Sequence, residues 1–138
     1  MGSLQLNMHY HIKDILKFIR LYDTSGIYKD QSNTKLRQYI RACLEKNSFY
    51  FVHIKGKLIG LVEWYRIKNC RYLVDRIRNK KFLNTNPSGK IIYVHNAVFK
   101  PSNLTMKIYK AFSRFHSNIT QIIWFRHKTK KFTSIKVK

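Results

Sequence analysis

Residues 91–99 have the sequence IIYVHNAVF, and KPSN follows at residues 100–103. The apolar run does not alternate with polar residues, which predicts a central strand covered on both faces. Pro101 would end that strand, and Ser102 and Asn103 are residues favoured at the start of a helix. We therefore predict a buried strand that is followed directly by a helix.

The segment after residue 103 completes this unit. An apolar stripe at helical spacing predicts the helix, and it consists of Leu104, Ile108, Ala111, Phe112 and Phe115. Residues 119–125, ITQIIWF, are largely apolar and predict the next strand. The strand, helix and strand over residues 91–125 form a crossover unit, in which the two strands are parallel.

Residues 48–67, SFYFVHIKGKLIGLVEWYRI, predict a β-hairpin upstream of the central strand. Two runs rich in β-branched and aromatic residues flank a short Lys55-Gly56-Lys57 connection. Gly56 can adopt the positive φ that tight hairpin turns require. This segment therefore supplies two antiparallel strands.

Two amphipathic helices are predicted before the hairpin. Apolar residues recur at helical spacing over residues 12–19 and again over residues 36–44. Ser32 or Asn33 would be the N-cap of the second helix. Alternating apolar residues in positions 4–8 predict a short first strand.

The rest of the chain completes a mixed α/β order. Residues 68–89 predict a helical turn or two and a loop, inserted between the hairpin and the central strand. At the C-terminal end, IIWFR and FTSIKV predict a strand pair around the turn HKTKK. The order is β-α-α-β-β-(α)-β-α-β-β, which predicts one α/β domain over residues 1–138 with a mixed central sheet flanked by helices. The alternative is another mixed α/β domain with the same crossover.

Positive charge is the strongest compositional feature of the chain. Twenty-eight Lys and Arg residues face six acids, for a formal net charge of +22. Residues 76–138 carry fifteen Lys and Arg and no acid. Such a field attracts polyanions, so nucleic acid, an acidic protein and a phosphorylated cofactor are the candidate partners.

Cations are interleaved with aromatic residues in two segments, residues 69–82 and residues 124–132. This composition is typical of surfaces that stack on bases and contact phosphates. The candidate anion-binding residues there are Arg71, Arg76, Arg78, Lys80, Lys81, Arg126, Lys128, Lys130 and Lys131. Lysines near the C-terminus also suit a second role, since charges protect an exposed sheet edge from pairing with other strands. No known nucleic-acid motif is present, so both interpretations stay open.

Several classes of protein and site do not fit the sequence. No window approaches the ~18 consecutive apolar residues of a transmembrane helix, and the first residues lack the pattern of a secretion signal. Cys43 and Cys70 form no metal or redox motif, which favours a reducing cytoplasm as the location. His9 and His11 are the only histidine pair near metal-ligand spacing, and we expect no metal site. Neither a Ser-His-Asp signature nor a phosphate-binding loop of the P-loop type is present.

The hairpin, the central strand and the helix after it resemble the GNAT acyltransferase superfamily over nearly the whole chain. The KGKLIG turn is similar to the one typical of that family, and IIYVHNAVFKPS resembles its fourth strand. The resemblance implies a GNAT-like domain that transfers an acyl group from a donor to an amine or hydroxyl. It also implies a helix N-terminus that faces the cofactor pyrophosphate. The implied cofactor-binding residues are Val98, Lys100, Ser102, Asn103 and Lys107.

The sequence departs from that family at the pyrophosphate loop. The family is rich in Gly and Arg there, whereas this chain has KPSNLTMK without a glycine. Relatives that lack the standard loop take acyl groups from acyl carrier protein, which is acidic. The expected donor is therefore either acyl-CoA or acyl carrier protein. Short, degenerate members of this fold occur in phage genomes, and the chain resembles this degenerate or phage-type group, in which enzyme activity is an open question.

Acyl transfer to an amine needs a base that removes a proton and a hydrogen-bond donor that polarises the thioester carbonyl. His95 and Glu63 are the candidate catalytic residues. His95 lies on the predicted central strand, where the resemblance places a base or a carbonyl-binding backbone, although a lone strand histidine is also common as a structural residue. Glu63 is the only acid between Glu45 and Asp75, and it would alternatively pair with a Lys or Arg.

Two functions follow from these observations. The first is an acyltransferase-like protein, active or degenerate, for which His95 and Glu63 would supply the chemistry. The alternative is a non-catalytic basic protein of phage or viral type that binds nucleic acid or an acidic protein partner. The basic segments favour that alternative, and whether the chain is an enzyme stays open.

Overall fold

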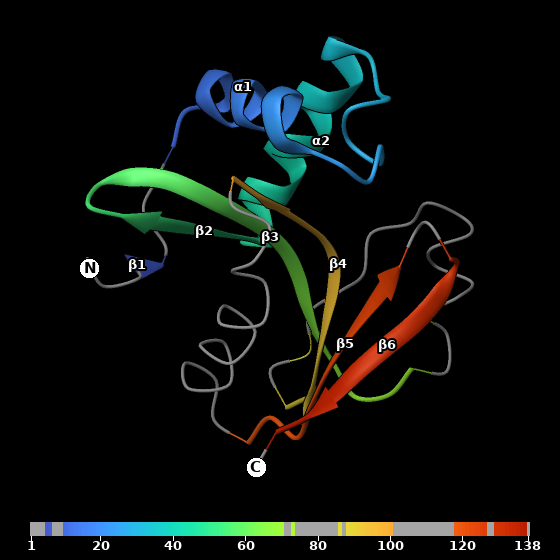
Figure 1. Cartoon of the computed structure of the whole chain (residues 1–138). Helices are drawn as coiled ribbons and strands as arrows, with labels where there is room; N and C mark the ends of the chain where they lie inside the picture. Colours follow the sequence, from blue (N-terminus) through green and yellow to red (C-terminus); the bar gives the residue numbers. More distant parts are fainter. Residues whose placement is uncertain are drawn as a thin grey trace. The chain divides into compact units, whose positions relative to one another are not determined.

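The protein has a mixed α/β fold, described here by a computed structural model (Figure 1). Its described residues are 5–6, 10–70, 73, 86, 88–100, 118–126 and 129–137. The elements are β1 (Gln5–Leu6), α1 (Ile12–Tyr22), α2 (Asn33–Glu45), β2 (Phe49–Ile54), β3 (Lys57–Ile67), β4 (Ile91–Phe99), β5 (Gln121–Arg126) and β6 (Lys131–Lys136). The described strands follow the order β1-β2-β3-β4-β5-β6. The predicted helix from Asn103 and most of the predicted insertion lie outside the described residues.

The chain divides into two compact units. The first contains residues 1–63 and 96–106, and the second contains residues 64–95 and 107–138. Both β3 and β4 therefore contribute residues to each unit.

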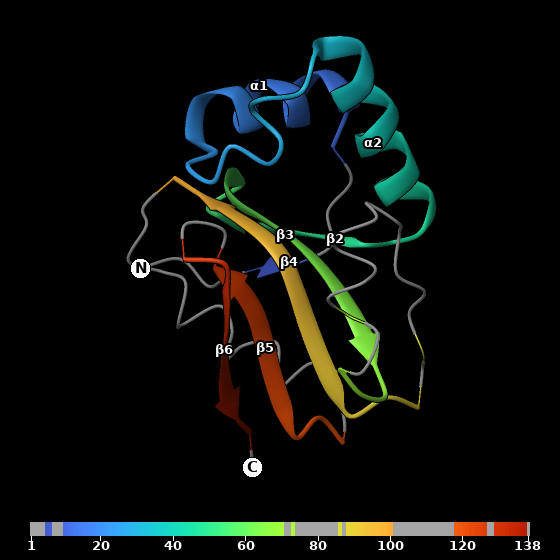
Figure 2. The same cartoon turned by 90° about the vertical axis from the view of Figure 1, so that its right-hand side faces the viewer.

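In the first unit, α1 and α2 lie side by side (Figures 1 and 2). The predicted stripe of α1 is buried at Ile15, Leu16 and Ile19, and Phe18 joins it. In α2 the buried residues are Leu36, Ile40 and Cys43. The side chain of Ser32 accepts a hydrogen bond from the Lys35 amide at 3.3 Å, which confirms Ser32 as the N-cap.

The loop between these helices is held by two charged side chains. Buried Asp23 accepts hydrogen bonds through both carboxylate oxygens, and the donors are the amides of Ser25, Tyr28 and Lys29 and the Ser25 hydroxyl. The Arg20 guanidinium donates to the side chain of Asn33 and to the carbonyls of Lys29 and Gln31. Because backbone groups on both sides of Tyr28 are bound in this way, the loop fixes the position of that tyrosine.

The predicted hairpin is formed by β2 and β3, which pair antiparallel from Phe49↔Glu63 to Ile54↔Lys57. Lys55 and Gly56 form the turn with φ angles of 52° and 77°, as in the two-residue turns that match strand twist. The predicted first strand is confirmed as β1, which pairs antiparallel with β2.

Gly60 brings the end of β4 close to the hairpin. A Cβ atom at this position would lie 2.5 Å from the ring of Phe99, so only glycine fits without a shift. The Lys100 amide also donates to the Ile59 carbonyl at 2.8 Å. These two contacts fix the backbone of Lys100.

In the second unit, β4 pairs parallel with β5 from Ile91↔Gln121 to Val94↔Trp124. This pairing confirms that residues 91–125 contain a parallel strand pair. Ile92, Tyr93 and Val94 are buried in succession, so both faces of β4 are covered here, as predicted. The predicted C-terminal strand pair is also confirmed, since β5 and β6 pair antiparallel and lie side by side in Figure 2.

The second unit has its own apolar cluster. Its buried members are Tyr65, Ile67, Leu73, Tyr93 and Ile123. Cys70, Ile91 and Phe125 are partly buried and pack against them. Within the described part of the chain, no helix is long and apolar enough to cross a membrane.

Candidate functional site

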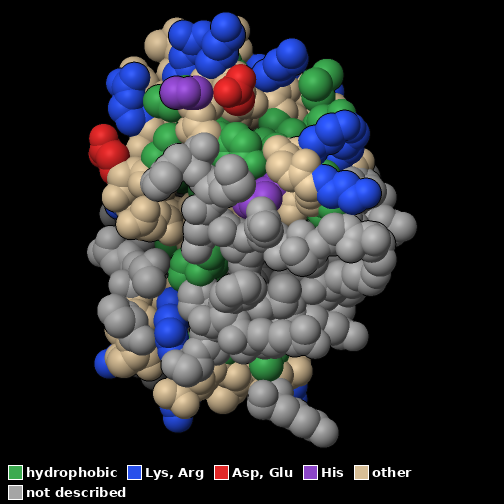
Figure 3. Space-filling view, turned by 90° about the vertical axis from the view of Figure 1, so that its left-hand side faces the viewer, with side chains coloured by type: hydrophobic (Ala, Val, Ile, Leu, Met, Phe, Trp, Pro, Cys, Tyr) green, Lys and Arg blue, Asp and Glu red, His purple; other side chains and the backbone are tan. Residues whose placement is uncertain are grey.

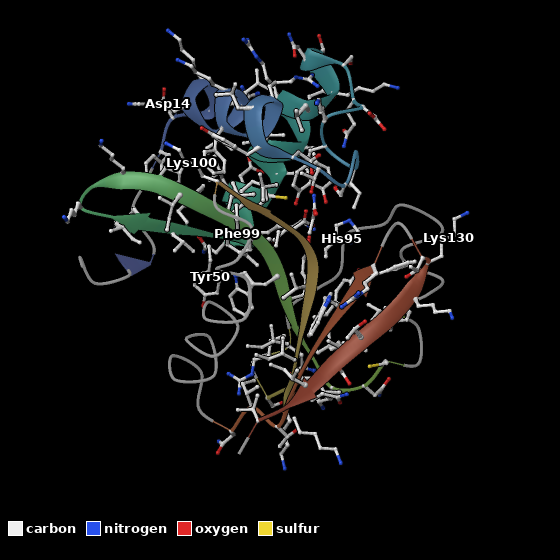
Figure 4. All side chains as sticks on the ribbon, in the orientation of Figure 1. Asp14, Tyr50, His95, Phe99, Lys100 and Lys130 are labelled. Carbon is white, nitrogen blue, oxygen red and sulfur yellow. The ribbon has the colours of Figure 1, made fainter. Side chains whose placement is uncertain are left out.

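His95, which is labelled in Figure 4, lies on β4. It comes directly after the last registered pair of β4 and β5, Val94↔Trp124. Its side chain is half-buried. Nδ1 of its ring lies 3.0 Å from the hydroxyl of Tyr93, which is fully buried two residues earlier on the same strand. This contact restricts the rotation of the imidazole and couples its tautomer to the Tyr93 hydroxyl.

The two tautomers of His95 suit different chemical roles. If the Tyr93 hydroxyl donates to Nδ1, the ring proton is on Nε2, which can then donate to a carbonyl oxygen. If Nδ1–H donates to the hydroxyl oxygen instead, Nε2 has a lone pair and can take a proton. The pair can therefore serve either acid or base chemistry.

Aromatic rings support Tyr93 on the side of the C-terminal strands. Its ring centroid is 6.4 Å from that of Phe132 on β6, and the Phe132 ring lies 5.0 Å from that of Phe125 on β5 in an edge-to-face arrangement. Such edge-to-face pairs are favourable beyond their buried area. The histidine is thus held by a tyrosine that is itself packed in the core of the second unit.

Glu63 lies in the first unit and is only 1% exposed. Tyr28 donates to its Oε1 at 2.6 Å, and the Tyr39 hydroxyl lies 2.7 and 2.6 Å from its two oxygens. These short O–H···O lengths are typical of hydrogen bonds to a carboxylate. Tyr28 is fully buried and Tyr39 is half-buried, so Tyr39 is the more exposed of the two partners of Glu63.

Two buried groups near Glu63, the Tyr28 hydroxyl and the Cys43 thiol, are held in their protonated forms. Burial raises the pKa of the Tyr28 hydroxyl well above its ordinary value, and the Glu63 charge raises it further. Burial also raises the pKa of the Cys43 thiol on α2, with a further contribution from Glu63. Cys43 is therefore an inert thiol at neutral pH, not a nucleophile.

The first unit also holds the last residues of β4. Asn96 is 6% exposed, and its Oδ1 accepts a hydrogen bond from the Ala97 amide at 2.9 Å. The predicted cofactor residue Val98 is buried, whereas the side chain of Lys100 is exposed at the end of the strand (Figure 4). Of these residues, Lys100 is the one placed to meet an anion.

The β5–β6 turn gathers three of the predicted anion-binding residues. Arg126, Lys130 and Lys131 are all exposed, and Arg126 lies opposite Lys131 in the strand register. Like charges at directly opposite positions are unfavourable, and a bound anion would offset that repulsion. On the face drawn in Figure 3, the described Lys and Arg side chains are instead scattered among other types.

Many predicted site residues lie outside the described part of the chain. They are Ser102, Asn103 and Lys107 of the implied cofactor helix, and Arg71, Arg76, Arg78, Lys80, Lys81 and Lys128 of the basic segments. The described ranges contain no group of three or more acids, histidines and cysteines that could hold a metal ion.

Tyr28, Tyr39 and Asn96 are polar side chains near the candidate residues that the sequence did not predict. Tyr39 lies within residues 36–44, whose apolar periodicity predicts only a helix. Nothing local marks Tyr28, because its partner Glu63 is 35 residues away. Asn96 had one available signal, since an amide in an otherwise apolar run predicts a buried polar group.

Comparison with known proteins shows a GNAT-like fold. Neither a protein-family model nor a curated protein sequence matches the chain. The loading GNATL domain of CurA from Lyngbya majuscula is 14% identical with a TM-score of 0.58, covering 90% of this chain and 65% of that one. The GNAT-like decarboxylase GphF in complex with isobutyryl-CoA is 14% identical with a TM-score of 0.53, covering 87% and 64%. PH1933 from Pyrococcus horikoshii OT3 is 10% identical with a TM-score of 0.53, covering 88% and 77%.

The chain spans slightly less than two thirds of the first two of these structures. At such low identities the likeness establishes the fold and not the activity. The predicted GNAT-like fold class is confirmed. The predicted catalytic and binding residues stay predictions.

Proposed function

We propose that the protein is a GNAT-like acyltransferase, which takes an acyl group from acyl-CoA and passes it to an amine or hydroxyl. The GNAT-like fold supports this proposal, and so does the isobutyryl-CoA in the GphF structure. The observation that carries it is His95, which follows the last β4–β5 pair with its Nδ1 3.0 Å from the buried Tyr93 hydroxyl.

The end of the β4–β5 ladder suits a substrate site. The C-terminal ends of parallel strands lie at the same edge of a sheet, and backbone groups beyond their last pair need other partners. The amides and carbonyls of a bound substrate are suitable partners for them. His95 is the first residue of β4 past the last registered pair, so a bound substrate would lie next to its ring.

His95 would act as the base of the transfer. The acyl donor, when bound, supplies an activated carbonyl as a thioester. The nucleophile forms a bond to the carbonyl carbon, the carbon–sulfur bond breaks, and His95 takes the nucleophile's proton and can return it to the leaving thiolate. Tyr93 would hold the ring so that the lone pair on Nε2 faces the nucleophile.

Lys100 would bind the phosphates of the donor. Its backbone is fixed by the hydrogen bond to Ile59, and its ammonium group is exposed at the end of β4. A lysine binds phosphate as a compact point charge. This residue fits an anionic donor even though the loop lacks the glycines typical of the family.

The first test is titration with acetyl-CoA and longer acyl-CoAs at moderate salt, followed by thermal unfolding. The ligand should raise Tm as its concentration increases, because it binds the folded chain alone. Lys100→Gln should weaken binding by roughly tenfold through loss of a charged contact, whereas Lys17→Gln, at an exposed position on α1, should not.

No Tm shift at millimolar ligand would contradict an acyl-CoA donor. The same assay with acylated acyl carrier protein then tests the carrier as the donor. A Tm shift with the carrier alone would replace acyl-CoA by the protein-bound thioester.

A further inference from the structure

Three side chains of the second unit, His95, Phe125 and Phe132, form a row across neighbouring strands. The strands β4, β5 and β6 lie next to one another in this order (Figure 2). Tyr93 pairs with Ile123, and side chains two residues apart on a strand point to the same face, so His95 and Phe125 lie on that face one step further along. Phe132 lies directly opposite Phe125 in the β5–β6 register. We call these three side chains the aromatic row.

Ring contacts agree with this placement. Measured between centroids, the Tyr93 ring lies 5.9 Å from the His95 ring and 6.4 Å from the Phe132 ring. The Phe132 ring lies 5.0 Å from the Phe125 ring. Because Tyr93 is fully buried, it forms a floor on which both His95 and Phe132 pack. The imidazole and the two phenyl rings therefore belong to one aromatic surface within a single unit.

Phe132 is the apolar exception on its face of β6. Ser134 and Lys136, the other residues on that face, are polar and exposed, as is usual at the edge of a sheet. Phe132 is 36% exposed, and in the described part of the chain Leu21 is the other large hydrophobic residue that is exposed. The exposed part of a phenyl ring contributes little to folding, since stability comes from removing apolar surface from water. Its position level with His95 points to a substrate that covers it.

We propose that the acyl acceptor is an amine that carries an aromatic ring, and that this ring packs against Phe132 and Phe125 while the amino group faces His95. This inference rests on the proposed function, in which His95 takes the proton of the nucleophile. The nucleophilic nitrogen must then lie within hydrogen-bond reach of the imidazole. The part of the acceptor next to that nitrogen meets the aromatic row. Phe125 and Phe132 are thus specificity-determining residues, and neither takes part in proton transfer.

The chemistry of the step favours an amine with a ring. The nitrogen forms a bond to the carbonyl carbon, the carbon–sulfur bond breaks, and the proton passes by way of His95 to the leaving thiolate. An amine suits a histidine base better than an alcohol does, because the pKa of an ammonium group, about 10, is closer to that of an imidazole. Aromatic rings also attract one another in offset or edge-to-face contacts, beyond the gain from buried area.

Charge argues against a second copy of the chain as the occupant of this surface. Each copy carries a formal net charge of +22, so two copies repel one another. Exposed Lys130 and Lys131 precede Phe132 directly, and such a contact would bring like charges together. An amine with one ring brings a single positive charge, which it loses on deprotonation.

The decisive experiment compares 2-phenylethylamine with ethylamine as acceptors, with acetyl-CoA as the donor. The two amines differ by the phenyl ring alone, and release of the CoA thiol measures both rates. Wild type should acylate 2-phenylethylamine with a kcat/KM at least about tenfold higher, the effect of burying a phenyl group. This comparison needs no variant and is therefore independent of any folding defect.

Variants at Phe132 test which residue recognises the ring. Phe132→Ala should lower the preference for 2-phenylethylamine by about 3- to 10-fold, the value of one favourable pair of rings. The kcat/KM for ethylamine should stay close to wild type, and Phe132→Trp should keep the preference. Leu21→Ala, at the exposed leucine on α1, is the matched control and should change neither rate. A structural role of Phe132 would lower both rates by the same factor and leave their ratio unchanged.

The outcomes distinguish this inference from the function on which it rests. If wild type acylates both amines equally, or neither of them although acyl-CoA binds, the assignment of the acceptor is wrong and donor binding stands. If Phe132→Ala keeps the preference, the assignment of the aromatic row is wrong. A dimer that dissociates in Phe132→Ala, measured by sedimentation, would show that a second copy covers Phe132. If acyl-CoA does not bind, the proposed function with that donor fails, and this inference fails with it.

Discussion

At the scale of single residues, the proposed chemistry depends on side chains whose partners fix their orientation. His95 can serve as an acid or as a base, and the Tyr93 hydroxyl, 3.0 Å from its Nδ1, couples the tautomer of the ring to the direction of that hydrogen bond. Glu63, the other predicted base, is buried and accepts hydrogen bonds from the hydroxyls of Tyr28 and Tyr39. It is therefore less accessible to a substrate than the half-buried His95. His95 is therefore the better candidate for direct proton transfer.

Replacing His95 tests this assignment. His95→Gln should lower kcat by about 10²–10⁴-fold, the usual contribution of a general base. The melting temperature and the affinity for acyl-CoA should stay close to wild type, because the side chain is half-buried and lies outside the core cluster. Steady-state kinetics with thermal unfolding measure both, and His11→Gln, at an exposed position, is the matched control.

Tyr93→Phe adds a second readout to this test. It removes the hydroxyl next to Nδ1 while keeping the aromatic packing, and kcat should fall because the imidazole is no longer held in one orientation. If His95→Gln lowers stability and leaves kcat unchanged, the histidine is structural.

At the scale of elements, the first unit joins a loop, a helix and a strand at one carboxylate. Tyr28 comes from the loop that Asp23 and Arg20 organise, Tyr39 comes from α2, and Glu63 comes from β3. Their hydrogen bonds are sheltered from water, so each is costly to break. Protonation of this cluster therefore links pH to the stability of the unit.

This linkage predicts loss of stability at alkaline pH. Burial raises the pKa of Cys43 above 9.0 and that of Tyr28 above 10.0, so the folded chain keeps protons that the unfolded chain releases. The free energy of unfolding should be insensitive to these groups below pH 9. It should then fall by up to about 1.4 kcal/mol per pH unit for each fully buried group, until pH reaches the folded pKa.

Urea unfolding between pH 7 and 11 measures this slope. Cys43→Ala should reduce the slope between pH 9 and 10, leaving the smaller contribution of Cys70, whose pKa burial also raises. An unchanged slope in Cys43→Ala would show that its thiol does not titrate differently in the two states. The absolute stability of that variant will also fall, because it leaves a cavity, so the slope is the informative quantity.

At the scale of the whole molecule, the net charge of +22 is the dominant property. A field of this sign attracts any polyanion at low salt. Around the β5–β6 turn, exposed Arg126, Lys130 and Lys131 are the described residues best placed to contact one together. Binding of nucleic acid or of an acidic protein there stays a prediction.

A salt series tests whether this turn binds a polyanion. The affinity for single-stranded DNA or RNA should fall by nearly one log unit per log unit of salt for each phosphate neutralised. Replacing Arg126, Lys130 and Lys131 with Gln should reduce this slope by about two to three. The fold should survive, since exposed charges contribute little to stability.

The matched control replaces Lys13, Lys17 and Lys35, which are exposed on α1 and α2, with Gln. It removes the same charge from another surface. Equal slopes in the two triple variants would mean that the turn has no special role, and that its lysines protect the edge strand β6 from pairing.

The sequence by itself determined the order of the elements. Apolar periodicity predicted α1 and α2, Ser32 predicted a helix start, and Gly56 predicted the hairpin turn. The largely apolar run at residues 91–99, which does not alternate with polar residues, predicted a strand covered on both faces. These features were predictable because each depends on residues that are near neighbours in the chain.

Only the tertiary structure decided which side chains meet. Tyr28 and Tyr39 bind a carboxylate 35 and 24 residues further along the chain, and no periodicity relates such positions. The last β4–β5 pair, which places His95 at the ladder end, depends on strand register. The locked amide of Asn96 depends on the backbone conformation at Ala97. Register and long-range contacts result from packing the whole chain, so a local pattern does not specify them.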